Sequence, residues 1–157
     1  MRRQFVELSL LAVATWCVIV VALIARAAEA KAPAGRFSVK SDSSGDVVVD
    51  ATFNRTWQRA TAPGTYVWSQ AKTYCGGLQL QGGGWRLPDL RELLSLVDIK
   101  ILSPAVDKAF FADTFGAGYW TATAYQPSAS NAWVVDFSDG DSSHVAIPNG
   151  YRVRCVR

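Results

Sequence analysis

The sequence is poor in the residues from which most catalytic and metal centres are built. It contains one histidine, His144, and three cysteines among 157 residues. A single imidazole excludes most zinc sites and most Ser-His or Cys-His nucleophile arrangements, because each needs further ligands or partners. A Gly-x-Ser-x-Gly elbow, a phosphate-binding loop and a dinucleotide fingerprint are also absent from the sequence. We therefore predict a binding protein with no metal and no cofactor, not an enzyme.

A strong excess of one charge is also lacking. From Lys31 onward, 13 Lys and Arg residues stand against 11 Asp and Glu residues, a net charge of +2. No run of cations alternates with aromatic residues, as a groove that follows a nucleic-acid strand requires. The sequence therefore predicts no nucleic-acid partner.

The one long apolar run lies at the N-terminus. Residues 1–3 are basic, residues 8–25 are almost wholly apolar, and residues 28–30 (Ala-Glu-Ala) suit a signal peptidase. Residues 1–30 are therefore predicted to be a signal peptide, cleaved before Lys31. The run is also long enough to span a bilayer, so an uncleaved anchor is the alternative, and the only membrane contact we expect. Either interpretation predicts export to the periplasm, the cell surface or the medium.

Two cysteines remain beyond this segment, Cys75 and Cys155. An oxidising compartment favours a disulfide between them. A nucleophilic thiol or a metal ligand would need a base or further ligands nearby, and no second Cys or His flanks either residue. A bridge that closes about 80 residues would stabilise the fold by about 4.5 kcal/mol in the chain-entropy model.

After a short linker at residues 31–35, residues 36–157 have the size of one domain. Two amphipathic helices are predicted in it. The first carries apolar residues at intervals of three and four over residues 68–78 and should end at the glycines 76–77. The second begins after Pro88. Its expected core face consists of Leu90, Leu93, Leu94 and Val97.

Two carboxylates, Asp89 and Glu92, stand where the second helix starts. At this position they favour the positive end of the helix dipole. An acid/base pair, as glycosidases use, is the alternative.

The extended segments indicate an α+β fold. Residues 37–40 and 47–51 suit a leading hairpin, and aromatic and β-branched residues dominate after Pro104. Trp120 and Trp133 lie in this second part and are expected in the core. Its predicted strands are residues 119–124, 132–137, 144–147 and 151–156.

The last of these strands alternates in character. Tyr151, Val153 and Cys155 share one face, so Arg152 and Arg154 should point outward from the other. We expect these two arginines, with Lys72 and Arg91, to form a basic patch for an acidic or sulfated glycan. Scattered cations that only solvate the domain are the alternative.

Trp85 and Arg86 allow two interpretations. Tryptophan stacks on sugars, and arginine binds carboxylates and sulfates. Their position after three glycines and before a helix favours a buried aromatic residue and an arginine that ties loop carbonyls or an internal carboxylate.

Two loops after Pro104 are candidate ligand sites. Asp136, Ser138, Asp139 and Asp141 surround Gly140 with oxygen ligands that calcium uses. Their spacing does not match an EF-hand loop, and an Asp-Gly hairpin turn explains them without an ion. The loop at residues 125–131 is the other place where a ligand could bind.

Several segments together resemble one known family. Residues 84–88 (Gly-Trp-Arg-Leu-Pro) with Glu92-Leu93, residues 132–137 (Ala-Trp-Val-Val-Asp-Phe) and residues 154–157 (Arg-Cys-Val-Arg) are similar to the C-terminal domain family of the Legionella collagen-like protein. The resemblance implies attachment to sulfated polysaccharide, often by trimers. This chain has no Gly-X-Y tract, the stalk that would form a trimer.

The Arg-Leu-Pro helix start is also similar to that of formylglycine-generating sulfatase-modifying enzymes. Their core is a variant of the C-type lectin-like fold, which implies two helices and a twisted antiparallel sheet here. Oxidase chemistry of that type would need free redox-active cysteines or a copper site, and the cysteine pair is expected to be bridged.

The expectations add up to an exported, C-type lectin-like module that acts in adhesion or extracellular recognition, with acidic or sulfated polysaccharide as partner. Fold alone does not fix function. A protein-binding or structural component of the cell envelope, without a glycan ligand, is the first alternative. An unrecognised enzyme is the second.

Overall fold

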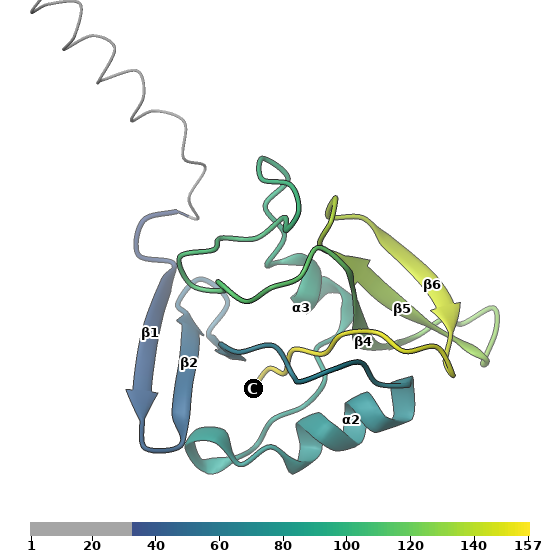
Figure 1. Ribbon diagram of the computed structural model, residues 1–157, viewed down its shortest axis with the longest axis horizontal. Coiled ribbons are helices and arrows are strands. Elements are labelled where there is room, and N and C mark those ends of the chain that lie inside the picture. The colour runs from purple at the N-terminus through teal and green to yellow at the C-terminus, as the bar shows by residue number, and fades with distance from the viewer. Residues whose placement is uncertain (1–32) are drawn as a thin grey trace, which may run out of the picture. The chain divides into compact units, whose positions relative to one another are not determined.

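A computed structural model describes residues 33–157 (Figure 1). The predicted signal peptide or anchor at residues 1–30, with its apolar run at residues 8–25, lies outside the described residues. Of the linker, the described part forms a turn in which the amide of Arg36 donates to the carbonyl of Pro33 at 2.9 Å. None of the helices in residues 33–157 has the length and apolar character needed to cross a membrane.

Antiparallel strands form two separate three-stranded sheets, where the sequence suggested one. The first holds the predicted leading hairpin, whose strands pair from Phe37 with Asp50 to Asp42 with Gly45. The second sheet holds three of the four strands predicted after Pro104. The first sheet comprises β1 (Phe37–Asp42), β2 (Gly45–Asp50) and β3 (Arg55–Gln58), and the second β4 (Gly118–Ala124), β5 (Asn131–Asp136) and β6 (Ser142–Ala146).

Both predicted helices are present, joined by a short 3-10 helix. Helix α2 (Trp68–Gly77) ends at the two glycines, as expected. After η1 (Leu80–Gly82) comes α3 (Leu90–Leu94), which is shorter than its apolar stripe suggests, so Val97 packs on the core from beyond the helix. Helices and antiparallel strands together confirm the α+β class. The C-type lectin-like identity of the fold stays a prediction.

The segment at residues 151–157 is not the continuous strand that its alternation predicts. It crosses the middle of the domain (Figure 1, yellow) and makes isolated bridges to four different parts of the chain. Because its partners change every one or two residues, no ladder develops. The bridges join Tyr151 to Tyr66, Arg152 to Tyr119, and Val156 to both Trp57 and Arg86.

Two hydrophobic cores lie on either side of this segment. Val156 belongs to the first core, whereas Val153 and Cys155 belong to the second. The second sheet also contributes to both, since Val135 packs in the first core and Val134 in the second. The first core includes Trp57, Leu93, Phe111, Tyr119 and Phe137, and the second includes Val47, Ala71, Trp85, Leu87 and Trp120.

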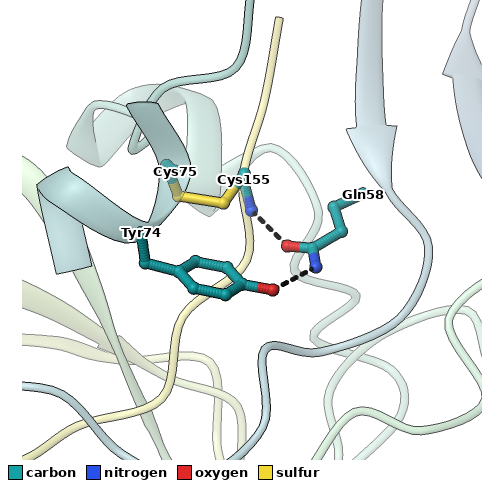
Figure 2. The surroundings of a disulfide bond; sticks show 4 residues. All are labelled: Gln58, Tyr74, Cys75 and Cys155. Atoms are coloured by element: carbon teal, nitrogen blue, oxygen red, sulfur yellow. Dashed lines mark hydrogen bonds between the residues drawn. A yellow bond between two sulfur atoms is a disulfide. The ribbon is translucent and has the colours of Figure 1, made fainter. Parts of the chain in front are cut away.

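The disulfide ties the last segment to α2, as predicted. Cys75 and Cys155 are fully buried, with their Cα atoms 5.5 Å apart. Figure 2 shows Gln58 beside the bridge. Its side-chain nitrogen donates to the hydroxyl of Tyr74 at 3.0 Å, and its oxygen accepts from the amide of Cys155 at 3.2 Å. The side-chain amide of Gln58 therefore links β3, α2 and the final segment.

Most of the predicted core residues are buried or pack against a core. Trp85, Leu93 and Trp120 are buried. Leu90, Leu94 and Val97 are half-buried and pack against the first core.

The prediction that Trp133 belongs to the core is wrong. Trp133 lies on the same face of β5 as the buried residue Val135, two positions before it. Its own neighbours, however, are the rings of Tyr125 and His144. Trp133 is half-buried and belongs to neither hydrophobic core.

Candidate functional site

Arg154, predicted to point outward, is buried with 1% of its surface exposed, so that prediction is wrong. Its guanidinium lies 4.8 Å from the ring centroid of Phe111. Nη1 donates to the carbonyl oxygens of Gln58 and Arg59. Nη2 donates to the hydroxyls of Thr61 and Thr114 at 2.8 and 2.9 Å, and to the carboxylate of Asp113 at 3.2 Å.

The alternation itself is right, because Arg154 does lie opposite Val153 and Cys155. What sequence periodicity misses is that both faces of this segment are covered. The face of Arg154 is closed by residues 58–61 and residues 111–114, which supply all five of its hydrogen-bond acceptors. Arg154 is therefore a structural residue.

Arg152 keeps a half-exposed position two residues earlier. Its Nη1 donates to the carbonyl of Gly64 at 3.1 Å, and its guanidinium lies 3.9 Å from the ring centroid of Phe115. Phe115 is 48% exposed, unusual for a large aromatic side chain. Among the described residues, no carboxylate forms an ion pair with Arg152. A cation and an aromatic face thus lie together at the surface.

The other predicted cations, Lys72 and Arg91, are exposed. Lys72 lies on α2 with its ammonium 3.6 Å from the ring centroid of Trp68. Arg91 lies on the exposed side of α3. Because Arg154 is buried, the basic patch predicted from Arg152, Arg154, Lys72 and Arg91 is not formed as expected.

Arg86 has the structural role that was favoured for it, although its side chain is 54% exposed and so not in the core. It donates two hydrogen bonds to the carboxylate of Glu92, which is 5% exposed. Arg55 donates a third at 3.0 Å. These contacts, with Arg86 first, lower the pKa of Glu92 to about 2.

Asp89 and Glu92 form a capping box at the start of α3. The Asp89 carboxylate accepts from the amide of Glu92 at 2.7 Å, and the Glu92 carboxylate accepts from the amide of Asp89 at 2.8 Å. A general acid must hold a proton near the working pH, and a carboxyl with a pKa of about 2 does not. The helix-start interpretation of this pair accounts for its geometry.

Turn chemistry likewise accounts for the carboxylates between β5 and β6. Asp136 accepts from the amide of Ser138 at 2.8 Å, and Asp139 from the amide of Asp141 at 3.0 Å. Gly140 has a φ of +88°, which a hairpin turn of this kind requires. Within residues 33–157, no three His, Cys, Asp or Glu side chains gather closely enough to hold a metal ion.

The loop predicted as a ligand site, residues 125–131, contributes Tyr125 to a cluster of three rings. The rings of Tyr125 and His144 stack at 3.8 Å with 10° between their planes. Trp133 meets both rings by edge-to-face contacts. These contacts hold the loop against β5 and β6.

A groove lies in another part of the surface, where no site was predicted. It consists of two hollows of about 390 and 370 Å³, within the range of ligand sites. Both hollows are lined by Gly45, Asp46 and Ala60, so they adjoin the same three residues. Arg59, Ala112 and Asp113 complete the first hollow, and Ser44, Gln58, Leu78, Gln79 and Leu80 complete the second.

The groove and the Arg152–Phe115 pair are joined by residues 59–64. Thr61 donates its amide hydrogen to Asp113 in the groove at 2.7 Å. Three residues further, Gly64 accepts from Arg152. We call the groove and this pair together the candidate surface.

Sequence reasoning missed four residues of the candidate surface: Asp46, Arg59, Asp113 and Phe115. They come from three distant parts of the chain, in loops or at strand ends, where hydrophobic periodicity carries no signal. The one available signal was Phe115, an aromatic residue in a Gly-rich stretch outside every predicted strand.

Comparison with known proteins agrees with the resemblance found in the sequence. A search of curated proteins found no match to this chain. The model of the Lcl C-terminal domain family matches residues 46–157, which is more than half of the chain. The match includes α2, α3, both cysteines and the whole second sheet. The chain therefore belongs to the Lcl C-terminal domain family, a membership that indicates an extracellular or envelope-associated module.

Proposed function

We propose that the domain is an exported binding module for adhesion or extracellular recognition, and that its ligand is an acidic or sulfated polysaccharide. The observation that carries the proposal is the pair of Arg152 and Phe115, a guanidinium 3.9 Å from a half-exposed aromatic ring and without a carboxylate partner among the described residues.

The pair offers two kinds of contact that such a ligand needs. A guanidinium presents a planar set of N–H donors that matches the oxygens of a sulfate or carboxylate. The one hydrogen bond of the Arg152 side chain uses Nη1 and leaves Nε and Nη2 for a ligand. The exposed part of the Phe115 ring adds apolar surface against which the C–H groups of a sugar ring pack.

Binding without catalysis is supported by how the carboxylates of the domain are used. Glu92 is ionised and tied by Arg86 and Arg55. The cysteines that redox chemistry would need are joined to each other and buried. Recognition needs none of these groups in a reactive state.

Retention on heparin at low salt tests the proposal. We expect the wild-type domain to bind and to be released as salt rises, because exposed charges are screened beyond about 8 Å at physiological ionic strength. Arg152→Ser and Phe115→Ala should each weaken binding, the first about tenfold, since a hydrogen bond to a charged group contributes about 1.5 kcal/mol.

Lys108→Ser is the matched control, because Lys108 is exposed and the change removes the same charge. It should leave heparin binding within about twofold of the wild type. Equal losses in Arg152→Ser and Lys108→Ser would show a general charge effect and contradict the proposed site. A wild-type domain that is not retained on heparin or on any acidic glycan at low salt rules out this ligand class.

A protein-binding component of the envelope is the second candidate. The observation that favours it is the loop that follows α3, where Ile99 and Leu102 are 80% and 67% exposed. Large apolar side chains exposed together mark interaction surfaces. In that case the double variant Ile99→Ser, Leu102→Ser should lose its attachment to cells, whereas Arg152→Ser should keep it.

A further inference from the structure

The groove holds a donor and an acceptor side by side in a fixed arrangement. Arg59 Nη1 donates to the carboxylate of Asp46 at 2.6 Å, and Arg59 Nε donates to the carbonyl of Phe110 at 3.3 Å. The two side chains are 35% and 41% exposed. These contacts use two of the five N–H groups of the guanidinium, so donors remain for a ligand.

The contacts of Asp46 stabilise the ionised form of its carboxyl. Hydrogen bonds from the hydroxyl of Ser41, and then from Arg59, hold the pKa of this carboxyl below its usual range. An ionised carboxylate accepts hydrogen bonds but donates none.

A second carboxylate, that of Asp113, lines the same hollow and is 47% exposed. One of its oxygens accepts from the amide of Thr61 at 2.7 Å, and the other from Arg154 at 3.2 Å. Because Arg154 is buried and fixed by four further hydrogen bonds, Asp113 cannot turn away from its place.

The rest of the lining is small or apolar. Ala60 and Ala112 are exposed and leave the hollow open. At the other end, Leu80 lies against Gly45, where an added Cβ would approach the Leu80 methyl to 3.1 Å. A glycine is therefore needed for this close contact between η1 and β2, and Gly45 also has a φ of +130°.

The charges select the ligand class. Each carboxylate of the first hollow already has a guanidinium partner, Arg59 for Asp46 and Arg154 for Asp113. Because these charges balance, neither an anion nor a cation gains much electrostatic free energy in the hollow. What fits is a neutral group that donates one hydrogen bond and accepts the next, as two adjacent hydroxyls do.

We infer that the groove binds a neutral sugar unit through two adjacent hydroxyls, one donating to Asp46 and the other accepting from Arg59. The inference rests on the proposed function and deepens it. Residues 59–64 contact Asp113 of the groove at one end and Arg152 at the other. We extend the inference to one polysaccharide chain whose neutral unit binds in the groove and whose acidic unit binds Arg152. Recognition then depends on the order of units along the polysaccharide as well as on its charge.

Backbone NMR of the whole exported domain tests this site, with trisaccharides of mannose, glucose and galactose as separate probes. We expect at least one of them to shift the amide signals of Gly45, Asp46, Ala60 and Ala112. Its affinity should be insensitive to salt, because the ligand is uncharged. No shift at these amides with any of the three probes would overturn the inference.

Two variants separate the site from its surroundings. Asp46→Asn keeps the size of the side chain and removes the charge, and should weaken trisaccharide binding about tenfold. Asp139→Asn makes the same change in an exposed turn and should have no effect. Ala112→Trp, at an exposed position, should fill the first hollow and abolish binding without removing any hydrogen bond. Unchanged trisaccharide affinity in Asp46→Asn and Ala112→Trp would contradict the site.

The two proposals fail separately. Arg152→Ser should weaken heparin binding and leave trisaccharide binding unchanged, whereas Asp46→Asn should do the reverse. Trisaccharide binding in a domain that does not retain heparin would overturn the acidic ligand and keep the groove. Heparin retention without any effect of trisaccharides on the groove amides would overturn the groove and keep the acidic ligand.

Discussion

Arg86 donates two hydrogen bonds to the carboxylate of Glu92, at 2.7 Å to Oε2 and 2.6 Å to Oε1. The same carboxylate accepts from Arg55 of β3 and from the amide of Asp89. Glu92 thereby joins the first sheet, the segment before α3 and the helix itself. One buried side chain fixes how three elements pack together, so its replacement should destabilise the packing of all three.

We predict that Glu92→Gln destabilises the domain by about 3 kcal/mol. The Glu92 carboxylate is buried, and its loss removes charge-assisted hydrogen bonds from Arg86 and Arg55 and breaks the capping box. Urea unfolding measures the difference. Leu94→Met, a swap of similar volume on the same helix, should cost less than about 1.5 kcal/mol. Equal costs in the two variants would refute the role given to Glu92.

The same carboxyl should make the domain sensitive to acid. The folded pKa of Glu92 is about 2, below the ordinary value of 4.5. The unfolded chain therefore binds the proton first, and the stabilisation is complete above pH 4.5 and lost as pH falls towards 2. In Glu92→Gln the unfolding free energy should fall less steeply across this window. Parallel pH profiles of the two proteins would contradict the assignment.

Substitution of the two arginines of the last segment should change the free energy of unfolding by very different amounts. Arg154→Ser removes the donors to five acceptors and should cost about 3 kcal/mol. Arg152→Ser should change stability by only about 0.5 kcal/mol, as surface substitutions usually do. Thermal unfolding of both variants distinguishes them. A stable Arg154→Ser protein would show that the burial of Arg154 is not needed for folding.

Reduction of the disulfide should lower the unfolding free energy by about 4.5 kcal/mol, because the bridge spans a sequence separation of 80 residues. Domains of this size are stable by about 5–15 kcal/mol, so loss of the bridge should remove about a third of the stability at the upper end of this range and nearly all of it at the lower end. Urea unfolding with and without reductant, and of Cys75→Ser, provides the measurement. Thiols that alkylate in the native exported protein would show that the bridge does not form.

We also predict that the exported chain begins at Lys31, because residues 28–30 suit a signal peptidase. The intact mass of the exported protein decides this. A full-length species that stays in the membrane after carbonate extraction would instead establish an anchor through residues 8–25.

The sequence predicts the parts of the fold that depend on local periodicity. The apolar stripe of α2 and its glycines define that helix, and strand alternation places Cys155 inward, so the disulfide could be anticipated. The capping pair Asp89 and Glu92 was likewise visible as a helix start. In each case the deciding residues lie within a few positions of one another.

Features that depend on what covers a segment could not be predicted. The alternation around Arg154 states which side the residue faces, but burial of that side depends on residues 111–114, some 40 positions away. The groove was invisible for the same reason, since Asp46, Arg59 and Asp113 meet only in the folded chain. The position of Trp133 in a strand likewise does not reveal that its neighbours are the surface rings of Tyr125 and His144.

The segment at residues 151–157 pairs with Trp57, Tyr66, Arg86 and Tyr119, all of which precede it in the chain. Because a chain is synthesised from its N-terminus, those partners leave the ribosome before this segment does. They stay without their central segment until it has been made, so the native state of the domain forms only after residues 151–157 have been synthesised.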